Sequence, residues 1–309
     1  MKIAVLGLGK MGSRVAQKLQ KEGHDVIGWN RSEISLKNIK TVKEIEKIFN
    51  YLSTPRVFWL MLPSGDATNE VLVQLSPFLR KGDIIIDGGN ANFKDTGKRF
   101  ESFKKQGINF LGIGVSGGIL AEKNGFPLMV GGSKKAYQTI KPILDSLSNP
   151  NGGHEYFGQG GAGHFVKMVH NGIEYGIMQS LGEGFEVLEK SKYKFNLLSV
   201  AKLWQKGTLV SGFMLDRAVD ALYKNPKLKG IVGSIEESGE ARWTVEEAKK
   251  MGIDVEIIER SLEYRRRSLK DKKIQNSFTA KMVAVLRNAF GGHSIRQAGD
   301  KSDKKKIYP

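Results

Sequence analysis

The chain has 309 residues, enough to bury a substantial core and to form about two domains. With 40% hydrophobic and 26% charged residues, its composition is globular rather than disordered. The absence of cysteine excludes disulfides, a thiolate nucleophile and cysteine-type zinc sites. No apolar run approaches the roughly 18 residues of a membrane span, and the first residues leave no room for a signal peptide. We therefore expect a cytoplasmic protein with no membrane partner.

The positive charge is concentrated in one part of the chain. There are 49 basic and 32 acidic residues, a net charge of +17, and residues 260–306 alone carry 14 basic and 4 acidic residues. Three interpretations are open at this point: an anionic small substrate or cofactor, a nucleic-acid footprint, and a lysine-rich solvated surface.

The first half of the chain alternates short apolar runs with helical patterns. We expect strands at residues 3–6, 25–29, 57–62, 83–87 and 108–115, and helices at 11–21, 67–75, 95–106 and 134–147. The runs at 57–62 and 84–86 are apolar at every position, which is typical of strands buried on both faces. The pattern predicts an α/β fold with a Rossmann-type, doubly wound parallel sheet.

A glycine-rich stretch at residues 149–163 interrupts this alternation. We place the domain boundary there, with a cofactor-binding domain at 1–160 and an all-helical domain for substrate binding and oligomerisation at 161–309. Residues 164–189 predict one long helix of about 40 Å. Its glycines suggest close packing against another backbone or a ligand. Residues 300–309 are expected to form a frayed tail.

The turn after the first strand has the pattern expected for a dinucleotide site. It contains, in order, Gly7, Leu8, Gly9, Lys10, Met11 and Gly12. Between a strand and a helix, such glycines allow a tight turn and a close approach of the backbone to a pyrophosphate. The helix N-terminus adds N–H donors and partial positive charge. An ordinary glycine-rich turn is the alternative.

The end of the second strand distinguishes NADP from NAD. An acidic residue there would bind the ribose hydroxyls of NAD, but this chain has Asn30, Arg31 and Ser32. Arg31 can hold a 2′-phosphate by charge-assisted hydrogen bonds, and its neighbours can add donors. NADP is therefore favoured over NAD, unless Arg31 is simply a solvated loop residue.

The long helix carries ionisable residues on one face. Four residues have the spacing i, i+3, i+4 and i+7: Lys167, His170, Asn171 and Glu174. They lie within an arc of about 100°, and apolar residues further along the same stripe indicate that it faces the interior. An inward Lys and Glu are candidates for a base and an acid. The alternatives are a solvated lysine, a satisfied core histidine and an incidental ion pair.

Two loops after predicted strands offer further candidates. They contain Asn90 in one loop and Ser116, Gly117 and Gly118 in the other. Ligands of open parallel sheets bind at the carboxyl ends of the strands, so both loops are expected where substrate and nicotinamide meet.

Together these segments resemble the decarboxylating 6-phosphogluconate dehydrogenases, in their short class, within the β-hydroxyacid dehydrogenase superfamily. The matching segments are GLGKMG, WNRS, DGGNANFKDT, GVSGG, GAGHFVKMVHNGIEYGIMQ, SGEARWT and RNAFGGH. They extend from residue 3 to about residue 293, and KMVHNGIEY is the most specific of them.

The resemblance implies oxidative decarboxylation of 6-phosphogluconate to ribulose 5-phosphate and CO2 with reduction of NADP, a step of the pentose phosphate pathway, without a metal. Lys167 matches the general base that takes the C3 hydroxyl proton, and Glu174 matches the acid that delivers a proton to C1 of the enediol. Substrate contacts are implied for His170, Asn171, Tyr175, Asn90, Ser116, Gly117 and Gly118. Asn90 is also expected to contact the cofactor, and Leu62 and Pro63 match the next cofactor loop.

The resemblance also implies cations for the substrate phosphate. Arg265 matches one of them, although the run at 265–267 leaves the register open, and Arg287 and His293 match a motif that reaches a neighbouring subunit's active site. A homodimer or homotetramer is therefore expected.

Departures from the long-class pattern at Ile119, Leu120 and Ser238 leave the sugar-acid specificity open. A related β-hydroxyacid dehydrogenase and a non-catalytic NADP sensor remain as alternatives. No nucleic-acid partner is expected, because the basic segment contains no recognised reading motif.

Overall fold

The computed structural model describes residues 1–291 and 294–297. The chain divides into two units, the first covering residues 1–170 and the second starting at Asn171. Residues 298–309 and His293 lie outside the described residues. No helix in the described parts of the chain is long and apolar enough to cross a membrane.

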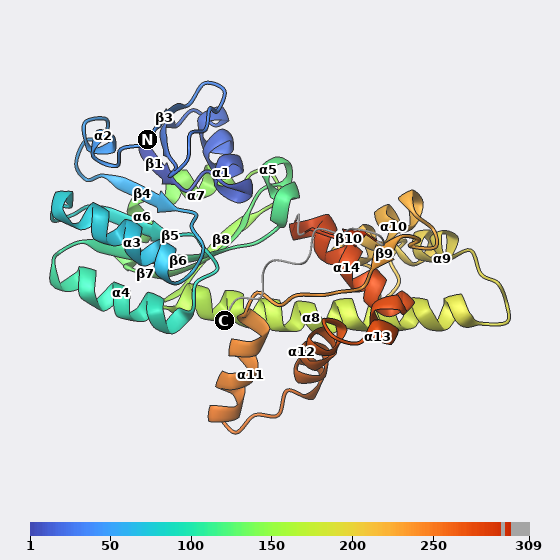
Figure 1. Ribbon diagram of the computed structural model, residues 1–309. Coiled ribbons are helices and arrows are strands. Elements are labelled where there is room, and N and C mark those ends of the chain that lie inside the picture. The colour runs from blue at the N-terminus through green and yellow to red at the C-terminus, as the bar shows by residue number, and fades with distance from the viewer. Residues whose placement is uncertain (292–293, 298–309) are drawn as a thin grey trace. The chain divides into compact units, whose positions relative to one another are not determined.

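The first unit is built on an eight-stranded sheet in the order β3-β2-β1-β4-β5-β6-β7-β8 (Figure 1). Its strands are β1 (Lys2–Leu6), β2 (Asp25–Trp29), β3 (Lys40–Val42), β4 (Val57–Leu60), β5 (Ile84–Asp87), β6 (Asn109–Val115), β7 (Pro127–Gly132) and β8 (Gly153–Gly158). All neighbouring strands are parallel except β6 and β7, which are antiparallel.

Both faces of this sheet are covered by helices. The helices are α1 (Lys10–Lys21), α2 (Glu46–Phe49), α3 (Asp66–Leu75), α4 (Phe93–Lys105), α5 (Ala121–Asn124), α6 (Lys134–Thr139) and α7 (Lys141–Ser148), with 3-10 turns η1 (Ser76–Phe78) and η2 (Gly118–Leu120). Successive strand residues point to opposite faces: Ile84 and Ile86 pack in the cluster that includes α1 and α7, whereas Ile85 packs with α3 and α4. The predicted doubly wound α/β fold is confirmed.

One local prediction for this unit was wrong, and three strands were not predicted. The helix predicted at 134–147 is broken at Ile140, because Pro142 begins a new helix there. The sheet also contains β3 and β7, which the sequence did not predict. The third strand, β8, is an edge strand inside the glycine-rich stretch at 149–163, where no element was predicted.

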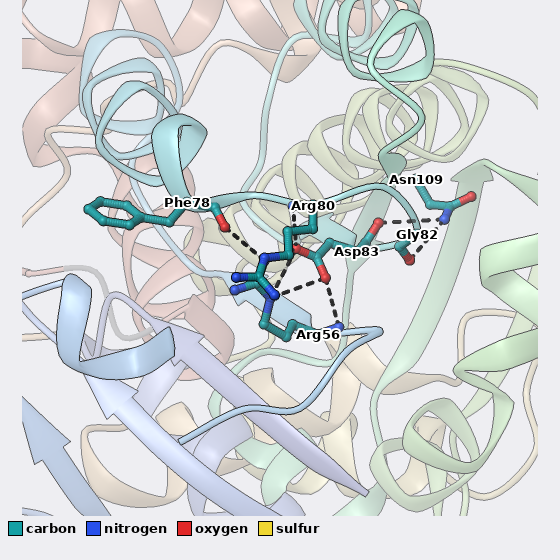
Figure 2. A network of polar contacts seen from close by, with 6 residues as sticks. All are labelled: Arg56, Phe78, Arg80, Gly82, Asp83 and Asn109. Atoms are coloured by element: carbon teal, nitrogen blue, oxygen red, sulfur yellow. Dashed lines mark hydrogen bonds and ion pairs between the residues drawn. The ribbon is translucent and has the colours of Figure 1, made fainter. Parts of the chain in front are cut away.

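The buried ion pair of Arg56 and Asp83 closes the amino-terminal edge of the sheet (Figure 2). Asp83 is fully buried and accepts hydrogen bonds from the backbone N–H and the guanidinium of Arg56, and from the backbone N–H of Arg80. Arg56 also donates to the carbonyl oxygen of Phe78 at 2.7 Å. The network fixes the amino-terminal ends of β4 and β5. The predicted cofactor site lies at the opposite, carboxyl ends of the strands.

The second unit is helical around the later turns of α8 (Ala162–Lys190), a single helix that begins in the first unit. The other helices are α9 (Leu197–Trp204), α10 (Phe213–Lys224), α11 (Glu240–Lys250), α12 (Glu256–Ser268), α13 (Lys272–Asn276) and α14 (Phe278–Gly291). A two-residue ribbon of β9 (Ile231–Val232) and β10 (Arg296–Gln297) is the one departure from the helical prediction within the described ranges. Met178 and Phe185 of α8 lie in its apolar core.

Candidate active site

The glycine-rich turn between β1 and α1 leaves room for a ligand at one of its glycines. Gly7 has φ +93°, and a Cβ there would come within 2.6 Å of the carbonyl oxygen of Met61. A Cβ on Gly12 would collide with the Gly7 carbonyl. At Gly9, by contrast, no atom lies within 4 Å of an added Cβ. Packing therefore explains Gly7 and Gly12, whereas Gly9 borders open space at the N-terminus of α1.

The loop after β2 is tied to this turn. Asn30 Oδ1 accepts a hydrogen bond from the backbone N–H of Leu8 at 3.1 Å, and Asn30 Nδ2 donates to Ser32 Oγ at 2.9 Å. Arg31 is 73% exposed and pairs with Glu70 at 2.8 Å. An exposed pair of this kind contributes about 0–1 kcal/mol, so Glu70 is readily replaced by a stronger anion.

The loop after β5 is anchored by the buried side chain of Asp87. Asp87 is buried and pairs with Arg99 at 2.9 Å, and it accepts from the backbone N–H of Gly89 at 3.2 Å. A Cβ on Gly89 would lie 2.6 Å from the carbonyl oxygen of Leu62, so the loops after β4 and β5 touch. Asn90, at the tip, is exposed. The sequence pattern indicates Asn90 but not the Asp87–Arg99 pair that anchors its loop, although a charged residue at the end of an apolar strand is a recognisable signal.

Glycines bring the start of α8 directly against β6 and β7. A Cβ on Gly163 would lie 2.5 Å from the backbone nitrogen of Gly131 and would collide with the carbonyl of Gly112. A Cβ on Gly114 would lie 2.8 Å from Cγ of Lys167. Since none of these contacts leaves room for a methyl group, the glycines determine where Lys167 lies.

Lys167 is 6% exposed, and its Nζ lies 3.2 Å from Ser116 Oγ. Ser116 follows β6, and the next two residues adopt positive φ, +86° at Gly117 and +58° at Gly118. The structure therefore brings the predicted base and the predicted serine loop together at the carboxyl end of β6.

His164, one helical turn before Lys167, is a buried residue that the sequence analysis did not select. Its Nδ1 lies 2.7 Å from Thr96 Oγ1, and its Nε2 is buried without a hydrogen-bond partner among the described residues. Burial lowers the pKa of His164, and the nearby Asp87 opposes that shift. His164 is thus a neutral group between α4 and α8.

The predicted polar face of α8 is inward. Lys167 and Asn171 are buried and His170 and Glu174 are partly buried, whereas Ile173 and Ile177 are exposed. The helix therefore has polar groups on its inner face and apolar groups on its outer face in this segment. Inward placement is what the base and acid assignments require.

In the second unit, two arginines gather at Tyr175. Arg265 is 2% exposed, and its guanidinium carbon lies 3.2 Å from the centre of the Tyr175 ring. Burial lowers the pKa of Arg265 to about 10; Tyr175 opposes the shift and the charge of Arg287 adds to it. Burial also lowers the pKa of Arg287, opposed by Tyr175, Glu236, Glu240 and Glu174.

The arginine run is now resolved into inward and outward members. Arg265 is buried on the same face of α12 as Leu262, whereas Arg266 and Arg267 are exposed. Spacing from Leu262 alone does not distinguish Arg265 from Arg266, because positions i+3 and i+4 share a helix face. Within the described ranges no carboxylate forms an ion pair with Arg265, so its charge is available to an anion.

The structure also contains a contact that the sequence analysis missed: Asn171 Nδ2 donates to Glu240 Oε1 at 3.1 Å. The two residues are 69 positions apart, and no local pattern linked them. Among the described residues, no group of three or more His, Asp or Glu side chains could hold a metal ion.

Two family models match the chain, one over its first part and one over its second. One family model, described as the NAD binding domain of 6-phosphogluconate dehydrogenase, matches residues 2–160. A second, described as 6-phosphogluconate dehydrogenase, C-terminal domain, matches residues 163–289.

Curated relatives include enzymes of both cofactor types. YqeC of Bacillus subtilis (strain 168), which bears a provisional 6-phosphogluconate dehydrogenase name, is 38% identical, with 96% of this chain and 100% of the relative covered. The NAD(+)-dependent, decarboxylating 6-phosphogluconate dehydrogenase of Haloferax volcanii is 34% identical, with 97% and 100% covered. An NADP(+)-dependent, decarboxylating enzyme of Bacillus subtilis (strain 168) is 36% identical, with 84% and 60% covered.

Solved structures of related enzymes are also similar to this chain. The 6-phosphogluconate dehydrogenase of Plasmodium falciparum, solved in its apo form, with NADP+ and with 6-phosphogluconate, has a TM-score of 0.78 at 27% identity, with 94% of this chain and 70% of that chain covered. A 3-hydroxyisobutyrate dehydrogenase of Mycobacterium tuberculosis, at 18% identity and a TM-score of 0.71, shares the fold, with 91% and 97% covered.

Proposed function

The chain belongs to the 6-phosphogluconate dehydrogenase family, and from this premise we propose that it oxidises and decarboxylates 6-phosphogluconate to ribulose 5-phosphate and CO2. In this reaction the C3 hydroxyl becomes a carbonyl, C1 leaves as CO2, and the resulting enediol gains a proton. Bound NADP supplies the acceptor for the hydride from C3.

The observation that carries the proposal is the buried amine of Lys167, 3.2 Å from Ser116 Oγ at the carboxyl end of β6. In this proposal Lys167 Nζ accepts the proton of the C3 hydroxyl while C3 is oxidised. The same proton then returns to the carbonyl oxygen as CO2 leaves. Accepting a proton requires a neutral amine, and burial favours the neutral form of a lysine.

In the same proposal Glu174 donates the proton that the carbon gains after CO2 has left it. It lies two turns after Lys167 on α8, about 10.5 Å further along the helix axis. The C3 oxygen and the carbon that loses CO2 are only two bonds apart, so the Lys167 and Glu174 side chains must converge on the substrate from two different turns of the helix. His170, Asn171 and Tyr175 are assigned to binding the substrate hydroxyls and carboxylate, together with the loops at Asn90 and Ser116.

Arg265 and Arg287 are assigned to the substrate phosphate. A buried guanidinium without an ion-pair partner is costly, and a phosphate would supply the missing negative charge through charge-assisted hydrogen bonds. Within the described ranges Arg265 stacks on Tyr175 and is influenced by the charge of Glu174, but no carboxylate forms an ion pair with it. His293, the third candidate, lies outside the described residues and stays a prediction.

The cofactor assignment rests on the turn at Gly7–Gly12. Open space at Gly9, no acidic residue in the first turn of α1 and no side-chain cap at its N-terminus fit a pyrophosphate. Arg31 favours NADP over NAD, with Asn30 and Ser32 shaping the loop around it. Leu62 and Pro63, after β4, are assigned to the same cofactor through the contact of Leu62 with the Gly7 turn.

We assign cofactor binding to residues 1–160, and substrate binding and oligomerisation to residues 161–309. The exposed Ile173 and Ile177 on the outer face of α8 support a homodimer or homotetramer. Size-exclusion chromatography with light scattering tests this assignment, and a monomer at working concentration would contradict it.

The deciding experiment measures reduction of NADP and of NAD with 6-phosphogluconate, gluconate and small 3-hydroxy acids side by side. We expect turnover with 6-phosphogluconate and NADP, one CO2 per NADPH, and ribulose 5-phosphate as the product. Oxidation of a 3-hydroxy acid without CO2 release would refute the decarboxylating assignment in favour of a related β-hydroxyacid dehydrogenase.

A further inference from the structure

Glu240 is a buried carboxylate to which no role has been given so far. It is 2% exposed, its Oε1 accepts the hydrogen bond from Asn171, and its Oε2 is buried without a partner among the described residues. A buried carboxylate with so few hydrogen bonds is costly. Such a group calls for an explanation other than stability.

Tight helix packing places Glu240 at this point. It is the first residue of α11, where the N-terminal end of the helix stabilises a negative charge. Thr244, one turn later, donates to the Glu240 carbonyl oxygen at 2.9 Å. A Cβ on Gly172 would lie 3.1 Å from the Thr244 side chain, so α11 lies close against α8 directly beside Asn171.

The chemistry of a carboxylate restricts the orientation of the neighbouring amide. An ionised carboxylate can only accept hydrogen bonds, whereas an amide has a donating and an accepting end. Asn171 must therefore turn Nδ2 toward Glu240 and Oδ1 away from it. A neutral partner such as glutamine would accept either orientation of the amide.

Resting on the proposed function, we propose that Glu240 is a positioning residue that locks the Asn171 amide so that its oxygen accepts a hydrogen bond from a substrate hydroxyl. The residue acts through Asn171 and does not itself touch substrate. The negative charge of Glu240 also acts on Arg287, so the same carboxylate helps to keep that guanidinium charged.

The first test compares Glu240→Gln with Glu237→Gln. Glu237 lies in the same segment, also has a buried Oε2 without a partner among the described residues, and pairs with Arg242 and Arg266 at 3.5 Å. Glutamine keeps an accepting oxygen but removes the charge and allows the Asn171 amide either orientation. We therefore expect Glu240→Gln to lower kcat/KM for 6-phosphogluconate about five- to tenfold, the difference between a hydrogen bond to a charged and to a neutral partner, with the KM for NADP and the Tm close to wild type. Glu237→Gln should change kcat/KM less than about twofold.

The second test reverses the pair. Asn171→Asp alone sets two carboxylates against each other and should lower kcat/KM more than Glu240→Gln does. In the double variant, Asn171→Asp with Glu240→Gln, the amide introduced on α11 can donate to the carboxylate introduced on α8, whose second oxygen still faces the substrate. We expect the double variant to be at least about tenfold more active than Asn171→Asp alone, a strong coupling between the two sites.

Two results would overturn the inference. One is wild-type kcat/KM in Glu240→Gln; the other is a double variant no more active than Asn171→Asp, which indicates a purely structural role. A wild-type enzyme that does not turn over 6-phosphogluconate would instead refute the proposed function, and the same cycle would then be measured with the hydroxy acid that it does oxidise.

Discussion

A methyl group added at Gly114 should displace Lys167, the proposed catalytic base. In Gly114→Ala the new Cβ would lie 2.8 Å from Cγ of Lys167 and closer still to its Cβ, whereas ordinary contact begins at 3.4 Å. The two segments must therefore separate by at least about 0.6 Å, in a region packed too tightly to yield freely. The start of α8 has no free space on this side, because Gly163 already packs directly on the backbone of Gly131.

The displacement has a predictable size of effect. A misplacement of about 1 Å can lower turnover about 100-fold, so we expect kcat to fall at least tenfold, with a smaller change in the KM for NADP. Overpacking costs about 1–3 kcal/mol, and each kcal/mol lowers Tm by about 2–4 °C in a chain of this size class. Steady-state kinetics and thermal unfolding measure the two effects independently.

The matched control is Gly97→Ala, in the middle of α4. No atom lies within 4 Å of a Cβ at Gly97, and alanine is favoured over glycine in a helix by about 0.5–1 kcal/mol. The control should keep wild-type activity and gain slightly in Tm. Wild-type kcat and Tm in Gly114→Ala would refute the claim that the glycines set the position of Lys167.

Four further predictions follow from the described contacts. Lys167→Ala should lose at least about 1,000-fold in kcat, while NADP affinity measured by fluorescence titration stays within twofold; near-normal turnover would remove Lys167 from its role. Arg31→Ala should lower kcat/KM for NADP about 10- to 100-fold and leave NAD unaffected, so an equal loss with both cofactors would contradict the 2′-phosphate assignment. Asp83→Asn leaves Arg56 buried without a counterion and should cost about 3–5 kcal/mol in urea unfolding; a cost below about 1 kcal/mol would count against the importance of that pair. Burial lowers the pKa of His164 in the folded state from its ordinary 6.5, so on acidification the unfolded chain takes up the proton first. The free energy of unfolding should therefore fall below pH 6.5, by up to about 1.4 kcal/mol per pH unit. His164→Gln should lessen that slope, and an unchanged slope would refute the conclusion that His164 is buried in its neutral form.

The elements that the sequence predicted share a strong local signal. Residues 84–86 are apolar at every position, and β5 is found there because a central strand buries both faces. β7 was missed because Pro127 and the glycines at its end have low strand propensity. It forms because β6 and β8 provide hydrogen-bonding partners on both sides, which local sequence does not reveal.

In the candidate site, too, some residues carry a local sequence signal and others are placed only by tertiary packing. Helical spacing predicted that Lys167 and Glu174 share one inward stripe of a helix, and their burial agrees with that placement. It could not identify Glu240, whose contact with Asn171 depends on how α11 packs on α8 at Gly172. Nor could it show that the Arg56–Asp83 pair is buried, because each residue alone resembles an ordinary charged loop residue. Both contacts join distant parts of the chain.

The division between the two units falls between His170 and Asn171, inside α8, where a flexible linker is absent. Helical phase is therefore a constraint on how this chain can change in evolution or by design. Inserting or deleting one residue at the division would rotate Glu174 by about 100° relative to Lys167 and shift it by about 1.5 Å. A chimera with a relative must either take α8 whole or join two helices in register. Insertions that most interdomain segments tolerate would here separate Lys167 from Glu174, the proposed base and acid.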